Sequence, residues 1–183
     1  MPLSPPQPRE HLHTRDIELR GYHRADGLWD IEAHMRDVKT YSFPNRERGT
    51  IDAGEPIHDM WLRLTIDDGM TIRAAEAATD ASPFGICGDV VPSLSKLEGL
   101  TIGPGWQRAA RQRVGGVHGC THLFELLGPI ATVAYQTKVR STTQRDPKKK
   151  PRHLDSCHAL STDGPIVKEH FPEFYTGERD NPS

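Results

Sequence analysis

Two stretches of alternating apolar and polar residues, each interrupted by an Asp-Gly pair, constrain the fold of this chain more than any other feature. In the first, "TRDIELRGYHRADGLWDIEAHMRDVKTY", Ile17 and Leu19 alternate with charged residues, and the alternation resumes at Trp29 after the turn pair Asp26-Gly27. A period of two residues is typical of a half-buried strand, and Asp-Gly is a strong signal for a tight hairpin turn. The stretch therefore predicts an antiparallel hairpin.

The second stretch repeats this pattern. "DMWLRLTID" alternates apolar with polar residues, "DDGM" at 67–70 supplies the turn, and "TIRAAEAAT" returns. Residues 42–55 between the two hairpins are polar and carry Gly and Pro, so we expect a loop there. The simplest assembly is an antiparallel sheet of about four strands made from two hairpins.

After Pro83 the spacing of apolar residues changes to that of helices. A first helix is expected from Asp89, as N-cap, to the stop at Gly99. "GWQRAARQRVGG" predicts a short basic helix. "CTHLFELLGPIATVAYQTK" predicts the longest helix, with a kink at Pro129.

Together these elements predict an α+β fold in which about three helices pack on one face of the sheet. We expect residues 1–13 to be a mobile, Pro-rich N-terminus and residues 14–138 to form a single α+β domain. Residues 139–183 are expected to be a basic linker and an extended tail that docks back on that domain.

Charge and composition exclude several classes of protein. The net charge is −2, and no apolar run approaches the roughly 18 residues of a membrane span, so we expect no nucleic acid or membrane partner. The basic run "RDPKKKPR" lacks interleaved aromatic residues, which favours a solvated strap over a nucleic-acid patch. The N-terminus lacks the apolar stretch of a signal peptide, and three widely spaced cysteines do not form a disulfide framework. The expected compartment is therefore the cytoplasm.

Ten histidines and three cysteines make a metal site worth testing. His58 precedes the third predicted strand, Cys87 enters the first predicted helix, and Cys120 opens the longest one. A helix N-terminus favours a thiolate, and a His/Cys/Cys set suits zinc, with iron as the alternative, while leaving a position for water or substrate. We expect His58, Cys87 and Cys120 to hold one metal ion.

Proton transfer at such a site is expected from Asp59, His122 or His158. Three other readings stay open at this stage. Cys120 could be a nucleophile with His118, His122 or His158 as base, Cys157-His158 could be a separate local metal site, and all of these residues could be structural.

The segments "DASPFGIC", "GLTIGPGW" and "GGVHGCTHLFELL" resemble a bacterial family catalogued as a domain of unknown function, number 2889, over about residues 14–138. More distantly, the order of elements is similar to the NifU/IscU-type iron–sulfur scaffold. That resemblance places His58, Cys87 and Cys120 at the scaffold's three cysteine positions. The chain departs from the scaffold pattern at His58 itself and at Gly119, which stands where the scaffold has a histidine.

The expected function is that of a small metal-dependent enzyme acting on a small organic molecule. Lyase chemistry of the retro-aldol or decarboxylation type is preferred, and the family resemblance implies an aromatic, catabolic substrate. The alternatives are a metal or iron–sulfur carrier, a metal-dependent hydrolase, and a metal-free binding domain. A homodimer is left open.

Overall fold

A computed structural model of the chain describes residues 3–139, 150–151 and 153–177. The chain divides into two compact units, Met1–Val139 and Arg140–Ser183, and each is described by itself. No helix among the described residues has the length and apolar character needed to cross a membrane.

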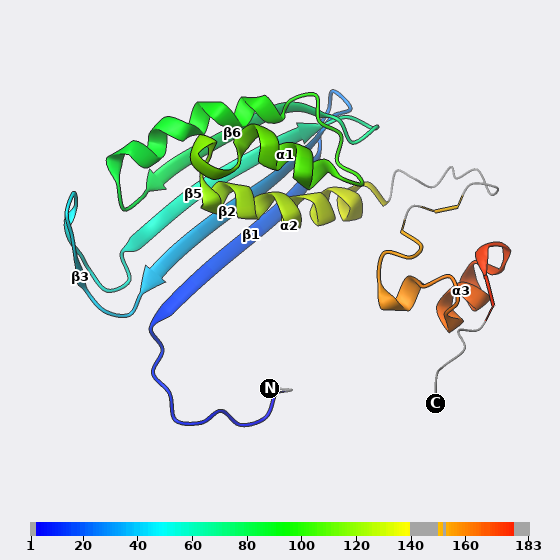
Figure 1. The fold of residues 1–183 in the computed structure, drawn as a ribbon, viewed down its shortest axis with the longest axis horizontal. Helices are drawn as coiled ribbons and strands as arrows, with labels where there is room; N and C mark the ends of the chain where they lie inside the picture. Colours follow the sequence, from blue (N-terminus) through cyan, green and yellow to red (C-terminus); the bar gives the residue numbers. More distant parts are fainter. Residues whose placement is uncertain (1–2, 140–149, 152, 178–183) are drawn as a thin grey trace. The chain divides into compact units, whose positions relative to one another are not determined.

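The first unit is built on a four-stranded antiparallel sheet with the strand order β1-β2-β5-β6 (Figure 1). Both predicted hairpins are confirmed, since β1 pairs with β2 and β5 pairs with β6. The pairing of β2 with β5 joins the two hairpins. The strands are β1 (His13–His23), β2 (Trp29–Lys39), β5 (Pro56–Ile66) and β6 (Ile72–Ala81).

The segment expected to be a plain loop contains a further small hairpin. Strand β3 (Phe43–Asn45) pairs with β4 (Gly49–Ile51). The side-chain oxygen of Asn45 accepts the backbone N–H groups of Glu47 and Arg48 at 2.9 Å each, which closes the turn. A side chain that bonds to its own local backbone in this way stabilises a turn that strand periodicity does not reveal.

The helices cover one face of the sheet, as predicted (Figure 1). After β6 the chain forms the 3₁₀ run η1 (Gly85–Leu97), helix α1 (Trp106–Val114), the single turn η2 (Gly116–His118) and helix α2 (Thr121–Lys138). The first predicted helix is longer than expected and is 3₁₀ rather than α. It contains Pro92, which lacks an amide hydrogen and crowds the turn before it. Helix α2 runs through Pro129, and the kink expected there stays a prediction.

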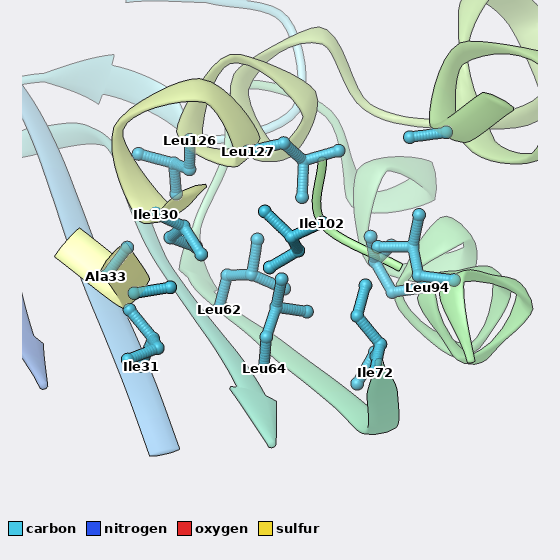
Figure 2. Packing of buried hydrophobic residues seen from close by; sticks show 14 of the residues in the cluster. Ile31, Ala33, Leu62, Leu64, Ile72, Leu94, Ile102, Leu126, Leu127 and Ile130 are labelled. Atoms are coloured by element: carbon cyan, nitrogen blue, oxygen red, sulfur yellow. The ribbon is translucent and has the colours of Figure 1, made fainter. Parts of the chain in front are cut away.

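The core lies between the sheet and these helices. Figure 2 shows side chains from β2, β5 and β6 meeting side chains from α2 and the segment before α1. Ile31, Leu64 and Ile130 are fully buried, which follows from the period-two pattern of the strands and the 3.6-residue pattern of the helix.

Two glycines allow α2 and its leader to approach their neighbours closely. A Cβ atom on Gly21 of β1 would lie 1.9 Å from the Thr137 hydroxyl oxygen in α2. A Cβ atom on Gly119 would lie 1.7 Å from the Val114 carbonyl oxygen. Because only glycine fits at position 119, the chain can turn tightly there and begin α2 directly beside the end of α1.

The second unit contains η4 (His158–Leu160), helix α3 (Pro165–His170) and η5 (Pro172–Phe174). Asp155 organises it, because one carboxylate oxygen accepts bonds from both the backbone N–H and the hydroxyl of Thr162. Most of the basic run 145–152 lies outside the described residues. The expected docking of residues 139–183 on the first unit stays a prediction.

Candidate functional site

One cross-strand rung on the helix-covered face of the sheet is polar, although the rung next to it toward the middle of the strands is apolar. Arg15 of β1 pairs with Asp37 of β2, and Asp37 pairs with His58 of β5. The next rung on this face, two residues along each strand, contains Met35 and Met60, which are both buried. Because side chains alternate between the two faces of a strand, Arg15, Asp37 and His58 all point to the side on which α2 lies.

Asp37 is the centre of this rung and is only 1% exposed. Its two carboxylate oxygens accept bonds from the Arg15 guanidinium at 2.8 Å each. One of these oxygens also accepts a bond from Nδ1 of His58 at 2.9 Å, and the other lies 3.3 Å from Nε2 of His13. Arg15 reaches a second carboxylate, Glu125 of α2, at 2.6 Å.

The first turn of α2 adds a second imidazole. The ring of His122 lies on the ring of His58 with 3.8 Å between the ring centroids and a tilt of 35°. The Cys120 sulfur lies 3.8 Å from Nδ1 of His122 and 4.0 Å from the sulfur of Met60. His58 and His122 therefore lie beside the buried carboxylate, and Cys120 lies beside His122.

The position of the Cys120 thiol follows from the local backbone. Cys120 is the N-cap residue of α2, with φ −106° and ψ 127°, and its side chain makes no capping bond. The tight approach at Gly119 fixes where the helix begins. The side chain is therefore directed toward Met60 and the core instead of toward the free amides of the helix.

The charges of the site favour a carboxylate and neutral imidazoles. Burial by itself raises the pKa of Asp37, but the bonds and charge of Arg15, together with the bond from His58, outweigh burial and hold that pKa below its usual range. Burial lowers the pKa of His58, and the neighbouring His122 lowers it further. Burial, followed by the charge of Arg15, lowers the pKa of His122. Both imidazoles are thus neutral near pH 7, the form that accepts a proton or binds a metal.

Asp37, His58 and His122 have potential ligand atoms that all lie within 4.8 Å of one another. They are the only group of three or more such residues found in the described part of the chain. The carboxylate of Asp37 already accepts bonds around both of its oxygens, which is typical of a carboxylate that orients a ligating histidine. With Nδ1 of His58 bonded to Asp37, Nε2 of His58 is the atom offered to a ligand.

The separation of Cys120 from His122 also suits a shared metal ion. Zinc lies about 2.3 Å from sulfur and about 2.0–2.1 Å from nitrogen, so a tetrahedral angle puts about 3.5 Å between two such ligands. The observed distance of 3.8 Å between the Cys120 sulfur and Nδ1 of His122 is close to this value. The donor set therefore fits zinc or iron(II), which both accept imidazole and thiolate ligands.

The structure brings together some of the predicted site residues and not others. His122 lies against both His58 and Cys120. Cys87 lies in η1, and neither it nor Cys120 belongs to the described group of three potential ligands. Asp59 lies on the opposite face of the sheet from His58, where it accepts a bond of 2.6 Å from His34. Adjacent residues of a strand point to opposite faces, so Asp59 cannot share a site with His58.

The remaining predicted residue, His158, lies in η4 of the second unit. His58 and His122 belong to the first unit, so the proton-transfer role of His158 stays a prediction. Cys157 is exposed in the same unit.

Sequence reasoning missed Arg15 and Asp37. The signal was present in the register, because Asp37 shares its face of β2 with Ile31 and Met35, and Arg15 shares its face of β1 with Leu19. A charged residue at a position where the pattern requires an apolar one marks a site that needs a partner.

A hollow of the first unit lies away from this site. A shallow hollow of about 300 Å³ lies over β5 and β6 on the outer face, between Glu32, Arg63 and Glu76. Arg63 already pairs with both glutamates there. We place the chemistry at the polar rung, because the charges that line this hollow are exposed and already paired with one another.

Comparison with known proteins bears on the family alone. Neither the comparison with curated proteins nor the comparison with solved structures gave a match. The likeness to the iron–sulfur scaffold therefore rests only on the order of elements. The family model described as "Protein of unknown function (DUF2889)" matches residues 13–136, which are nearly all of the first unit. The chain belongs to this family.

Proposed function

We propose that this protein is a metal-dependent enzyme whose single metal ion, zinc or iron, is bound by His58, His122 and Cys120. The observation that carries the proposal is the group formed by Asp37, His58 and His122, whose potential ligand atoms lie within 4.8 Å of one another, with the Cys120 sulfur 3.8 Å from Nδ1 of His122. The Asp37 carboxylate accepts a bond from Nδ1 of His58 and so orients the ring. A carboxylate commonly occupies this position beside a histidine that binds a metal.

Burial and geometry support a functional reading of this rung. A buried charged residue costs stability unless it is paired, and an apolar rung would have completed the core at lower cost. Instead the chain places an arginine, a carboxylate and two imidazoles with lowered pKa values at one place. Perturbed groups that cluster in this way are typical of active sites.

The metal ion would act as a Lewis acid that polarises a substrate oxygen. The chain's own residues supply the rest of the chemistry. His58 and His122 would hold the ion as neutral imidazoles, because their lowered pKa values keep them unprotonated near pH 7. Arg15 is paired with both Asp37 and Glu125, so its role is to hold the Asp37 carboxylate in place beside His58.

These features suit a lyase reaction of the retro-aldol or decarboxylation type on a small organic substrate. In both reactions negative charge develops on the substrate as a carbon–carbon bond breaks, and the metal ion would stabilise that charge. Metal-dependent hydrolysis is the alternative for the same donor set. A catabolic, aromatic substrate is proposed from the family resemblance alone.

A second candidate is a metal-free enzyme that uses Asp37 and His58 as an acid–base pair. It is favoured by the charge of Arg15, which opposes a second cation, and by the stacking of His58 on His122. An iron–sulfur carrier has less support, because clusters prefer several thiolates and only Cys120 joins this site among the described residues.

Metal analysis of purified protein distinguishes these candidates. We expect about one zinc or iron ion per chain, and we expect His58→Ala and His122→Ala to lose most of it. His34→Ala is the matched control, because His34 is also bonded to an aspartate and stacked on a ring, but on the outer face of the sheet. Wild-type protein that retains no metal and binds none on addition of zinc would support the metal-free enzyme.

A further inference from the structure

Strand β1 forms the edge of the sheet, and no described strand pairs with its outer side (Figure 1). Such an edge presents a row of unpaired N–H and C=O groups that can pair with another strand. It extends over eleven residues, His13–His23, without a bulge in its pairing to β2.

The hydrogen bonds beside β1 show which of its backbone groups point outward. At both ends of the hairpin, even-numbered residues bond across to the β2 side: the Leu12 carbonyl accepts from Thr40, and the N–H of Arg24 donates to Leu28. Because the pattern alternates along an antiparallel pair, the odd-numbered residues of β1 direct their N–H and C=O groups to the open edge.

We propose that this edge pairs with β1 of a second copy of the chain, antiparallel, about a two-fold axis at Leu19. In this register Leu19 faces the partner's Leu19, and Ile17 faces the partner's Gly21. Both positions direct their backbone groups to the open edge, so they form the hydrogen-bonded pairs of the new ladder. The two sheets become one continuous sheet of eight strands.

The charges on the outer face of β1 select this register. Glu18 and Arg20 are both exposed, and they already form an ion pair of 2.6 Å within their own strand. With the axis at Leu19, Glu18 of each copy lies opposite the partner's Arg20, and the four charges alternate in sign. Opposite charges on facing strands stabilise a pair, whereas like charges in that position destabilise it.

Registers with the axis at Glu18, Arg20 or Ile17 create like-charge pairs. An axis at Glu18 places two glutamates opposite each other, and an axis at Arg20 does the same with two arginines. An axis at Ile17 places Asp16 opposite the partner's Glu18, twice. The axis at Leu19 instead places Asp16 opposite the partner's Tyr22, a side chain that is 43% exposed in the single copy.

The apolar side of β1 fits the same arrangement. Ile17 is 41% exposed although it points to the face that α2 covers, so the single copy leaves it incompletely packed. In the pair, Ile17 lies over the partner's Gly21, where Thr137 of α2 fills the space above the glycine. The pair would therefore bury apolar surface that the single copy leaves in water.

The test is the mass of the full chain in solution. A single copy has a mass of 20.5 kDa, and we expect light scattering after gel filtration to give about 41 kDa, twice that value. Glu18→Arg and Arg20→Glu should each give single copies, because each places like charges opposite one another. Glu10→Arg is the control, since it makes the same charge change on an exposed residue before β1 and should leave the pair intact.

Mixing the two variants makes the test specific to the register. An equimolar mixture of Glu18→Arg and Arg20→Glu chains should form a mixed pair, because the arginines of one copy then face the glutamates of the other. The double variant that carries both changes should pair with itself. A wild-type mass of one copy overturns the proposal, and so does a pair that both single variants leave intact.

Discussion

Asp37→Asn tests the most unusual part of the fold, a buried carboxylate that joins three strands. The change keeps the shape of the side chain but removes its charge and places an NH₂ group against donors on Arg15 and His58. A hydrogen bond to a charged group contributes roughly 1.5–3 kcal/mol, and breaking a buried ion pair costs roughly 3–5 kcal/mol. Arg15 is about one-third exposed and keeps Glu125, so we expect a loss of about 2–4 kcal/mol.

Urea unfolding of the wild type and the variant measures this loss as a shift in the free energy of unfolding. Asp59→Asn is the matched control, because Asp59 is bonded to a histidine on the outer face and is partly exposed. The control should cost less than about 1 kcal/mol. Equal losses for the two variants would refute the reasoning that burial and Arg15 make Asp37 special.

The same pair of proteins gives a pH test. The pKa of Asp37 is lower in the folded chain than the value of about 3.9 that it takes on unfolding, so the carboxylate stabilises the fold at all pH values above about 4. That contribution is lost as the pH falls through the lowered pKa. The difference between wild type and Asp37→Asn should thus be constant near neutral pH and shrink in acid.

Two further predictions concern the histidines and the start of α2. Because the pKa values of His58 and His122 are lowered by folding, the unfolded chain binds more protons below about pH 6.5, so the free energy of unfolding should fall as the pH drops from about 7 to about 5. Replacing both histidines by Gln should flatten that slope in urea titrations, and an unchanged slope would mean that other groups cause it. Gly119→Ala should cost about 1–3 kcal/mol, because the new Cβ would lie 1.7 Å from the Val114 carbonyl oxygen. Gly103→Ala, which meets open space, should leave the melting temperature nearly unchanged, and equal effects of the two changes would contradict this reason.

The sheet could be predicted from the sequence because local signals and long-range packing agree there. The period of two residues and the Asp-Gly pairs specify both hairpins, and β1, β2, β5 and β6 lie where the pattern places them. The β3–β4 hairpin was missed because a single side chain, Asn45, closes its turn. The 3₁₀ form of η1 was missed because the spacing of apolar residues indicated a helix there, whereas Pro92 within the run disfavours the α form.

The site was harder to predict, because it depends on register between strands. His58, Cys120 and His122 could be identified as candidates from residue type and position. Their partner Asp37 becomes visible only when β2 is aligned between β1 and β5, so that Asp37 lies opposite His58. The same alignment removes Asp59, since a shift of one residue along a strand changes the face of the sheet.

Cobalt(II) titration of the metal-free protein tests the central claim most directly. Cobalt(II) takes imidazole and thiolate ligands in place of zinc, and a bound thiolate gives a charge-transfer band in the near ultraviolet. We predict saturation at about one cobalt per chain, a thiolate band that disappears in Cys120→Ser, and loss of tight binding in His58→Ala but not in His34→Ala. A spectrum without a thiolate band, or binding that survives His58→Ala unchanged, would contradict a metal site at His58, His122 and Cys120.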